Sequence, residues 1–232
     1  MKARIGTRRG IWAQTIYLGA AGALLMLSLP PEIGRGELRD VNLLLAFLIV
    51  QLLAATYLTS GFASAELALD GEKSLPDLVL SAFSPGEVAT GKLESSALYA
   101  AYLIAVALPL ATLAASLRGT PLAAIVPAGL ITVAIATAVG TWGAWLGGRF
   151  PSDFTRSFIH WVMLTAVFAG TALLPAPWRA INPLRLVEDA VRVGWSTRTG
   201  VAIAGYLAAA LGGTLAIAAH VRHTRGGTEV LG

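Results

Sequence analysis

The sequence predicts an all-α polytopic membrane protein whose six helices cross the bilayer. Of its 232 residues, 56% are hydrophobic and only 13% are charged, whereas an ordinary soluble domain carries about a quarter charged residues. The charges also leave six segments without Asp, Glu, Lys or Arg: residues 10–31, 41–65, 95–117, 119–148, 157–178 and 199–221. Each segment reaches the about 20 residues that a spanning helix needs. This composition excludes a soluble domain and a disordered chain.

The charge-free segments place the six spans within one transmembrane domain, residues 1–232. We expect them at residues 11–29, 42–64, 95–117, 121–147, 157–174 and 200–221. The first one follows basic residues, as a signal peptide does, but it is longer than a signal core and ends in Pro30-Pro31 without a small-residue cleavage site. It is therefore predicted to be a retained helix.

The distribution of basic residues predicts the orientation. An even number of spans puts both termini on one side, and ten of the 17 Lys and Arg residues fall on that side. Because cytoplasmic loops are enriched in Lys and Arg, both termini, including residues 1–10, are predicted to be cytoplasmic in a multi-pass protein of the cell membrane.

The loop of residues 65–94, between spans two and three, is predicted to hold a cytoplasmic helix. It contains six acidic residues and two lysines, so it cannot lie in hydrocarbon. Leu75, Leu78, Val79 and Ala82 repeat with the period of a short amphipathic helix. Ser84-Pro85 then breaks the chain, and proline can begin a second short helix that leads to span three.

The outer loop, residues 175–199, is predicted to hold an interfacial helix before span six. Asn182 is a helix cap and Pro183 suits the first helical position. One face is apolar and the opposite face is charged and pairs at i, i+3 and i+4. The apolar face comprises Leu184, Val187, Val191 and Trp195, and the charged face Arg185, Glu188, Asp189 and Arg192.

Small residues predict close helix contacts, either within one subunit or between two. Gly143 and Gly147 form a GxxxG pair, and Gly205, Ala209 and Gly213 place a small residue at every fourth position.

The predicted spans lack the groups that drive ion-coupled transport or hydrolysis. His220 lies at the very end of span six, so His160 is the only Asp, Glu, Lys, Arg or His side chain further inside a span, and we expect it to be interfacial or hydrogen-bonded. With three histidines, no cysteine and no HExxH motif, no metal site and no catalytic residue is predicted, so the chain is not expected to be an enzyme by itself. The basic residues are scattered at helix ends, which favours lipid headgroups over nucleic acid as their partners.

One motif resembles a phosphate-binding loop. Residues 86–92 read GxxxxGK, but Leu93 replaces the Ser or Thr that binds magnesium. A P-loop also follows a buried strand, whereas this segment lies in a short cytoplasmic loop. ATP binding by this chain is therefore not expected.

The loop sequence EKSLPDLVLSAFSPGEVATGK, residues 72–92, resembles the loop between the second and third helices of ABC-2 type transporter permeases, which typically reads E-G-T-L-x-x-L-L-x-S-P-x-S-x-x-E-I-x-x-G-K. It departs at Lys73, where Gly is usual, and at Ala82, where Pro is usual. The sequence NPLRLVEDAVR, residues 182–192, is similar to the family segment N/F-P-L-x-x-x-x-x-A-L-R before the last helix. The loop matches at Glu72, Ser74, Leu75, Leu78, Ser81, Ser84, Glu87, Val88, Gly91 and Lys92.

This resemblance implies the membrane-spanning permease subunit of an ATP-driven exporter. A second permease subunit and separate ABC ATPase subunits are then its partners, together with membrane lipids, and ATP and magnesium bind to the ATPase rather than to this chain. The residues implied in ATPase coupling are Glu72, Leu75, Leu78, Val79, Ser84, Glu87, Gly91 and Lys92, and those of the outer interfacial helix are Asn182, Pro183, Arg185, Glu188 and Arg192.

Two alternatives stay open. A haem-exporter-like permease has a similar loop between its second and third helices, although the segment of residues 182–192 favours the broader family. A membrane scaffold or assembly subunit that transports nothing belongs to a different class. The sequence leaves open the transported substrate and the choice between homodimer and heterodimer.

Overall fold

The computed structural model describes residues 8–28, 42–73, 83–117, 121–150, 152–176 and 178–229, and the regular structure in these ranges is helical throughout. The long helices are α2 (Arg8–Ser28), α3 (Leu43–Lys73), α5 (Pro85–Leu117), α6 (Ile125–Arg149), α7 (Asp153–Thr165) and α9 (Thr197–Glu229). The shorter elements are η1 (Leu122–Ala124), the π-helical turn η2 (Ala166–Gly170), η3 (Thr171–Leu173), η4 (Trp178–Ile181) and α8 (Pro183–Val193).

Five helical segments in the described part of the chain are long and apolar enough to cross a membrane. They are Leu43–Ala65, Pro85–Leu117, Leu122–Arg149, Asp153–Leu173 and Thr197–Thr224. They match predicted spans two to six, so the all-helical, multi-pass membrane fold is confirmed. The first predicted span forms the 21-residue helix α2, whose crossing of the membrane stays a prediction.

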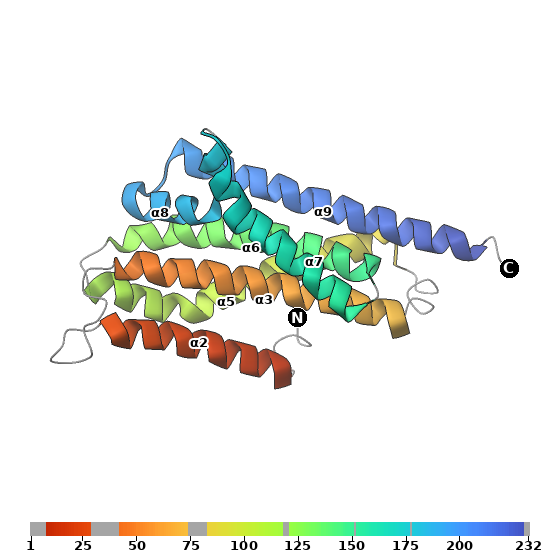
Figure 1. Cartoon of the computed structure of the whole chain (residues 1–232), viewed down its shortest axis with the longest axis horizontal. Helices are drawn as coiled ribbons and strands as arrows, with labels where there is room; N and C mark the ends of the chain where they lie inside the picture. Colours follow the sequence, from red (N-terminus) through yellow and green to blue (C-terminus); the bar gives the residue numbers. More distant parts are fainter. Residues whose placement is uncertain are drawn as a thin grey trace.

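The long helices lie side by side and alternate in direction along the chain (Figure 1). Helices α3 and α6 lie in the middle, α2 lies against α3 and α5, α9 lies against α6 and α5, and α7 runs obliquely across the bundle (Figure 1). We call the end where α3 stops, α5 starts and α9 reaches the C-terminus the junction end. Helix α8 lies at the opposite end, which we call the α8 end (Figure 1). Under the predicted orientation, the junction end is cytoplasmic.

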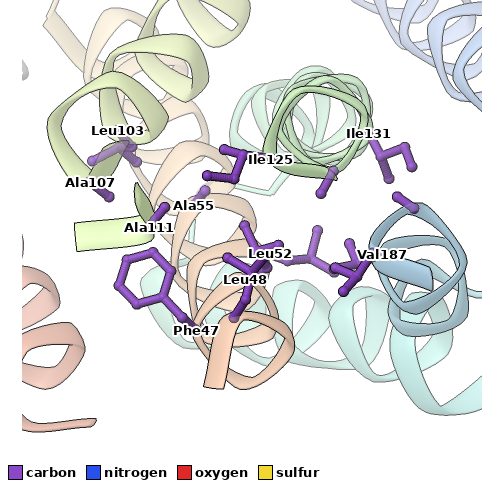
Figure 2. Packing of buried hydrophobic residues seen from close by; sticks show 14 of the residues in the cluster. Phe47, Leu48, Leu52, Ala55, Leu103, Ala107, Ala111, Ile125, Ile131 and Val187 are labelled. Atoms are coloured by element: carbon purple, nitrogen blue, oxygen red, sulfur yellow. The ribbon is translucent and has the colours of Figure 1, made fainter. Parts of the chain in front are cut away.

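The apolar core lies where α3, α5, α6 and α8 meet (Figure 2). Because lipid tails are as apolar as leucine, this core is stabilised by close packing rather than by removal from water. Figure 2 shows the side chains that interlock there, which include Phe47, Leu48, Leu52, Leu103, Ile125, Ile131 and Val187.

Helix α6 contacts α3 most extensively, through a line of glycines. A Cβ atom on Gly143 would lie 2.8 Å from the Ser60 carbonyl oxygen, and one on Gly147 would clash with the Ser64 carbonyl oxygen. The GxxxG pair therefore packs two helices within one subunit, which resolves one of the alternatives that the sequence left open.

The small-residue repeat on α9 divides into two parts. A Cβ atom on Gly213 would lie 2.7 Å from Thr141 Oγ1, whereas one on Gly205 would meet nothing within 4 Å. The exposed Ala209 presents its carbonyl oxygen, which accepts a hydrogen bond from Trp142 Nε1 at 3.0 Å. Only the Gly213 end of the repeat makes the close helix contact that the spacing predicts.

Both helices that flank the predicted coupling loop extend into it. Helix α3 continues to Lys73, beyond the expected span end at residue 64, and α5 starts at Pro85, ten residues before the expected span start at residue 95. The second short helix predicted to begin at Pro85 is therefore the first part of α5. No helix breaker separates Pro85 from the apolar segment, since Gly86 and Gly91 are tolerated inside a helix at a modest cost.

Candidate functional sites

The junction end holds the residues that the sequence associates with ATPase coupling, and the structure describes part of them. Glu72 lies in the last turn of α3, while Leu75, Leu78 and Val79 lie outside the described residues. Ser84, Glu87, Gly91 and Lys92 lie at the start of α5. Three of the eight predicted residues therefore belong to helix α5, which continues into a membrane span, and Ser84 directly precedes it.

Ser84 and Glu87 form a reciprocal capping box at this helix start. The Ser84 backbone N–H donates to Glu87 Oε2 at 2.6 Å, and the Glu87 backbone N–H donates to Ser84 Oγ at 3.2 Å. Such a box satisfies two donors that the first turn of a helix otherwise leaves free. Both residues are exposed, so the box fixes the direction of α5 without a contribution from the core.

The segment that resembles a phosphate-binding loop is helical. Residues 86–92 form the first two turns of α5, and the Val88 N–H donates to the Ser84 carbonyl oxygen at 3.1 Å. A P-loop instead turns successive N–H groups toward the phosphates. Residues 86–92 therefore do not have the conformation of a P-loop.

Asn182 organises the α8 end through both atoms of its side-chain amide. Its Oδ1 accepts hydrogen bonds from the backbone N–H groups of Leu184 at 3.0 Å and Arg185 at 3.2 Å, which confirms it as the helix cap. Its Nδ2 donates to the Phe168 carbonyl oxygen at 2.8 Å and to Thr171 Oγ1 at 2.9 Å. This second role cannot be predicted from the sequence, because no local pattern shows that the chain leaves the regular α-helix at residues 166–173.

The buried face of α8 differs from the predicted one. Trp195 lies beyond the helix end and is 57% exposed, and Leu184 is only half-buried. The helix packs against α6 and α3, so contact with two helices decides which of its sides is buried. The buried residues are Pro183, Leu186, Val187, Ala190 and Val191.

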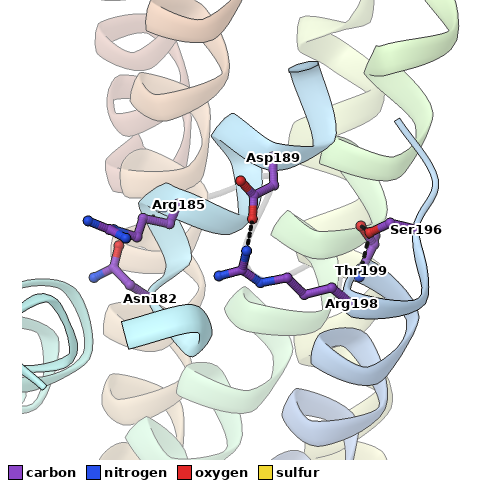
Figure 3. A network of polar contacts seen from close by, with 6 residues as sticks. All are labelled: Asn182, Arg185, Asp189, Ser196, Arg198 and Thr199. Atoms are coloured by element: carbon purple, nitrogen blue, oxygen red, sulfur yellow. Dashed lines mark hydrogen bonds and ion pairs between the residues drawn. The ribbon is translucent and has the colours of Figure 1, made fainter. Parts of the chain in front are cut away.

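The charged side chains of α8 form one ion pair within the helix and one ion pair with the neighbouring helix α9. Arg192 lies 2.8 Å from Glu188, as the i, i+4 spacing predicts. Asp189 instead pairs with Arg198 at the start of α9, at 2.9 Å (Figure 3). The second pair connects two helices, and Arg185 points outward beside Asn182 (Figure 3).

His160 is buried between α7 and α3 and is hydrogen-bonded, as expected. Its Nε2 lies 3.3 Å from Ser60 Oγ, and Ser60 Oγ donates to the Thr56 carbonyl oxygen at 2.7 Å. Since the Ser60 hydroxyl has used its proton, this network assigns the histidine proton to Nε2. In the described part of the chain, no three His, Cys, Asp or Glu side chains lie close enough together to hold a metal ion.

Comparison with protein-family models, with curated proteins and with solved structures finds no match for this chain. What the chain does must therefore be inferred from its own residues. The helix layout, the junction end and the α8 end are the features that bear on it.

Proposed function

We propose that the chain is the membrane-spanning permease subunit of an ATP-driven exporter of the ABC-2 type. It works as a pair of permease subunits, and each one docks a separate ATPase through the loop of residues 65–94. The observation that carries the proposal is the sequence pattern of residues 72–92. The two helices that flank this segment support the proposal, because both of them pack on the central α6.

The length of α5 supports a coupling role for its first turns. A helix of 33 residues is about 50 Å long, whereas the hydrocarbon core is about 30 Å thick. The start of α5 therefore extends beyond the hydrocarbon, and the Ser84–Glu87 capping box stabilises its first turn. A push on this extension by an ATPase moves the membrane-spanning part of the same helix.

The source of energy is a second supporting argument. The charge-free segments that form the middle of the five described spans hold no Asp, Glu, Lys or Arg, and His160 is engaged with Ser60. Pumps and ion-coupled carriers usually place such groups within the membrane. An external ATPase supplies the energy that these spans are not equipped to supply.

Co-expression with the ABC ATPase encoded beside this chain tests the proposal. Affinity purification through a tag on this chain should yield a complex whose ATP turnover rises in nanodiscs. Leu78→Arg should weaken the complex at least tenfold, because it places a charge on the predicted apolar contact. Val193→Arg is the matched control: Val193 is 69% exposed and lies at the α8 end, so the complex should persist.

Two outcomes contradict the proposal. One is the absence of any ATPase complex for the unmodified chain in the presence of ATP and magnesium. The other is a Leu78→Arg chain that binds and stimulates the ATPase as well as Val193→Arg does. A complex with normal ATP turnover that moves none of a panel of lipid and amphipathic probes across vesicles would indicate a scaffold instead.

A further inference from the structure

A small polar cleft lies between α3 and α7 toward the junction end. Its volume is about 170 Å³, and polar atoms contribute more of its surface than apolar ones. It is separate from the capping box and from α8, and it includes His160, whose hydrogen bond to Ser60 is described above. The side chains that line it include Tyr57, Ser64, Arg156, Ser157, His160 and Trp161.

Arg156 gives the cleft a positive charge that can be shared with a ligand. Its side chain is 15% exposed, and its guanidinium pairs with Asp153, whose side chain is 90% exposed. A guanidinium has five N–H donors, and one carboxylate uses at most two of them. Because Asp153 is almost fully solvated, an anion in the cleft can replace it at little cost.

Two hydroxyls and a histidine complete the polar wall. Ser64 and Ser157 bring hydroxyl groups from α3 and α7. His160 is only 6% exposed, and its Nδ1 has no hydrogen-bond partner in the described part of the chain. A buried polar atom without a partner is costly, so this wall is unusual for a surface made only to face hydrocarbon. With the proton on Nε2, Nδ1 is an acceptor, so the donors that the cleft offers to an anion are Arg156 and the serine hydroxyls.

Aromatic rings form the other side of the cleft and indicate that its occupant is a lipid. Tyr57 and Trp161 are 44% and 58% exposed, and their ring centroids lie 5.4 Å apart. Tyr and Trp concentrate at the level of lipid headgroups, where one part of the ring is apolar and the other is wet. Phe158 and Phe154 continue this exposed aromatic surface along α7. A free phosphate ion has no apolar part that could pack against this surface.

We propose that this cleft binds the phosphodiester headgroup of an anionic phospholipid from the leaflet at the junction end. Arg156 and Ser157 donate hydrogen bonds to the phosphate oxygens, and Tyr57 and Trp161 pack on the glycerol backbone and the first acyl carbons. Basic pockets between transmembrane helices recognise anionic headgroups in this way. The site is independent of the proposed coupling to an ATPase.

Native mass spectrometry of the delipidated full chain in detergent tests this site. Titration with phosphatidylglycerol should give one preferred bound lipid, at least fivefold tighter than phosphatidylcholine with the same acyl chains. Arg156→Gln should weaken phosphatidylglycerol about tenfold, the loss expected for one charge-assisted contact. Arg149→Gln is the matched control, because Arg149 is exposed at the end of α6 and does not line the cleft, and it should change the affinity less than twofold.

Asp153→Asn provides a second variant that leaves Arg156 in place. Removal of the competing carboxylate should tighten phosphatidylglycerol at least twofold, whereas a purely structural Arg156–Asp153 pair predicts weaker binding. The proposal is overturned if Asp153→Asn weakens binding, or if Arg156→Gln changes it no more than Arg149→Gln does. Complete displacement of the lipid by an equal concentration of inorganic phosphate would also overturn it and would indicate a free-anion site.

Discussion

Asn182 connects two stretches of chain that have no regular hydrogen bonds to each other. Its amide caps α8 and also binds the irregular end of the preceding span at Phe168 and Thr171. The residue is 2% exposed, so water cannot replace these hydrogen bonds. The capping half is predictable from the Asn-Pro sequence, because capping depends on three neighbouring residues. The hydrogen bonds from Asn182 Nδ2 are not predictable in this way, because their acceptors lie 11 to 14 positions away along the chain.

Replacement of Asn182 should separate these two roles. Asn182→Ala removes both and should lower the free energy of unfolding by about 2 kcal/mol, since it loses a cap and takes the amide donor away from the partly buried Phe168 carbonyl oxygen. Asn182→Ser keeps a capping oxygen but is too short to reach Phe168, so it should lose about half as much. Denaturant titration in detergent measures both values, and an unfolding free energy equal to the unmodified chain's for Asn182→Ala would contradict the assignment.

The hydrogen bond between His160 and Ser60 joins α7 to α3, beside the ring contacts that Tyr57 makes with His160 and Trp161. A double-mutant cycle of Ser60→Ala and His160→Leu should give a coupling free energy of about 1 kcal/mol, in the range of hydrogen bonds between membrane helices. Unfolding titrations of the four chains measure it. The same cycle with Ser64→Ala, one helical turn further along α3, should give a coupling near zero. Equal coupling in the two cycles would show that general packing, rather than this bond, joins the helices.

At the scale of the elements, the glycines of α6 determine how closely two spans approach. Gly140, Gly143 and Gly147 face Thr59, Ser60 and Ser64, with spaces too narrow for a methyl group. The neighbouring atoms include backbone carbonyl oxygens, which cannot move without the whole of α3. The sequence predicts the small-residue face, but it does not name the helix that fills it, because any helix with a flat side would serve.

Alanine substitutions test this packing. Gly143→Ala should lower the free energy of unfolding by about 2 kcal/mol, because the added methyl group forces α3 and α6 apart. Gly147→Ala should cost more, since its Cβ would lie closer to the carbonyl oxygen of α3. Gly205→Ala meets nothing within 4 Å and should leave stability unchanged or slightly raised. Thermal unfolding of the three variants measures these effects. Equal unfolding temperatures for Gly143→Ala and Gly205→Ala would contradict the close packing of α6 on α3.

For the outer helix α8, the sequence predicts where the helix starts but not which of its sides is buried. The expected start of α8 is confirmed, because its cap and its first proline are local signals, whereas the helix ends at Val193, before Trp195. The expected apolar face is wrong in part, because the sequence predicts an interfacial helix, whereas α8 packs on α6 and α3. Two neighbouring helices bury a broader and rotated surface, which includes Leu186 and Ala190.

At the scale of the whole molecule, the direction of each helix in the bundle alternates (Figure 1). With α2 as a sixth crossing, Arg8 lies on the same side as Ser152 and Thr224, and Trp195 lies on the opposite side. Under the alternative of five crossings, Arg8 would share the side of Trp195. The crossing of α2 is thus the point that distinguishes the two topologies.

Single-cysteine labelling tests this topology without background, because the chain has no cysteine. In intact cells, a membrane-impermeant maleimide should label Trp195→Cys. It should label Arg8→Cys, Ser152→Cys and Thr224→Cys only after the membrane is opened. Labelling of Arg8→Cys together with Trp195→Cys in intact cells would remove the sixth crossing, and labelling of the other two in intact cells would invert the predicted orientation.

The sequence by itself determined which apolar segments form the long helices, where α8 begins, and that the protein belongs in a membrane. These are local properties, because the thickness of the hydrocarbon demands about 20 uncharged residues in a row and a cap depends on adjacent residues. Only the tertiary structure decided which faces meet, that the GxxxG pair acts within one subunit, and that Asp189 pairs with α9. Spans that are apolar around their whole circumference carry no periodic signal to separate a lipid-facing side from a packed one.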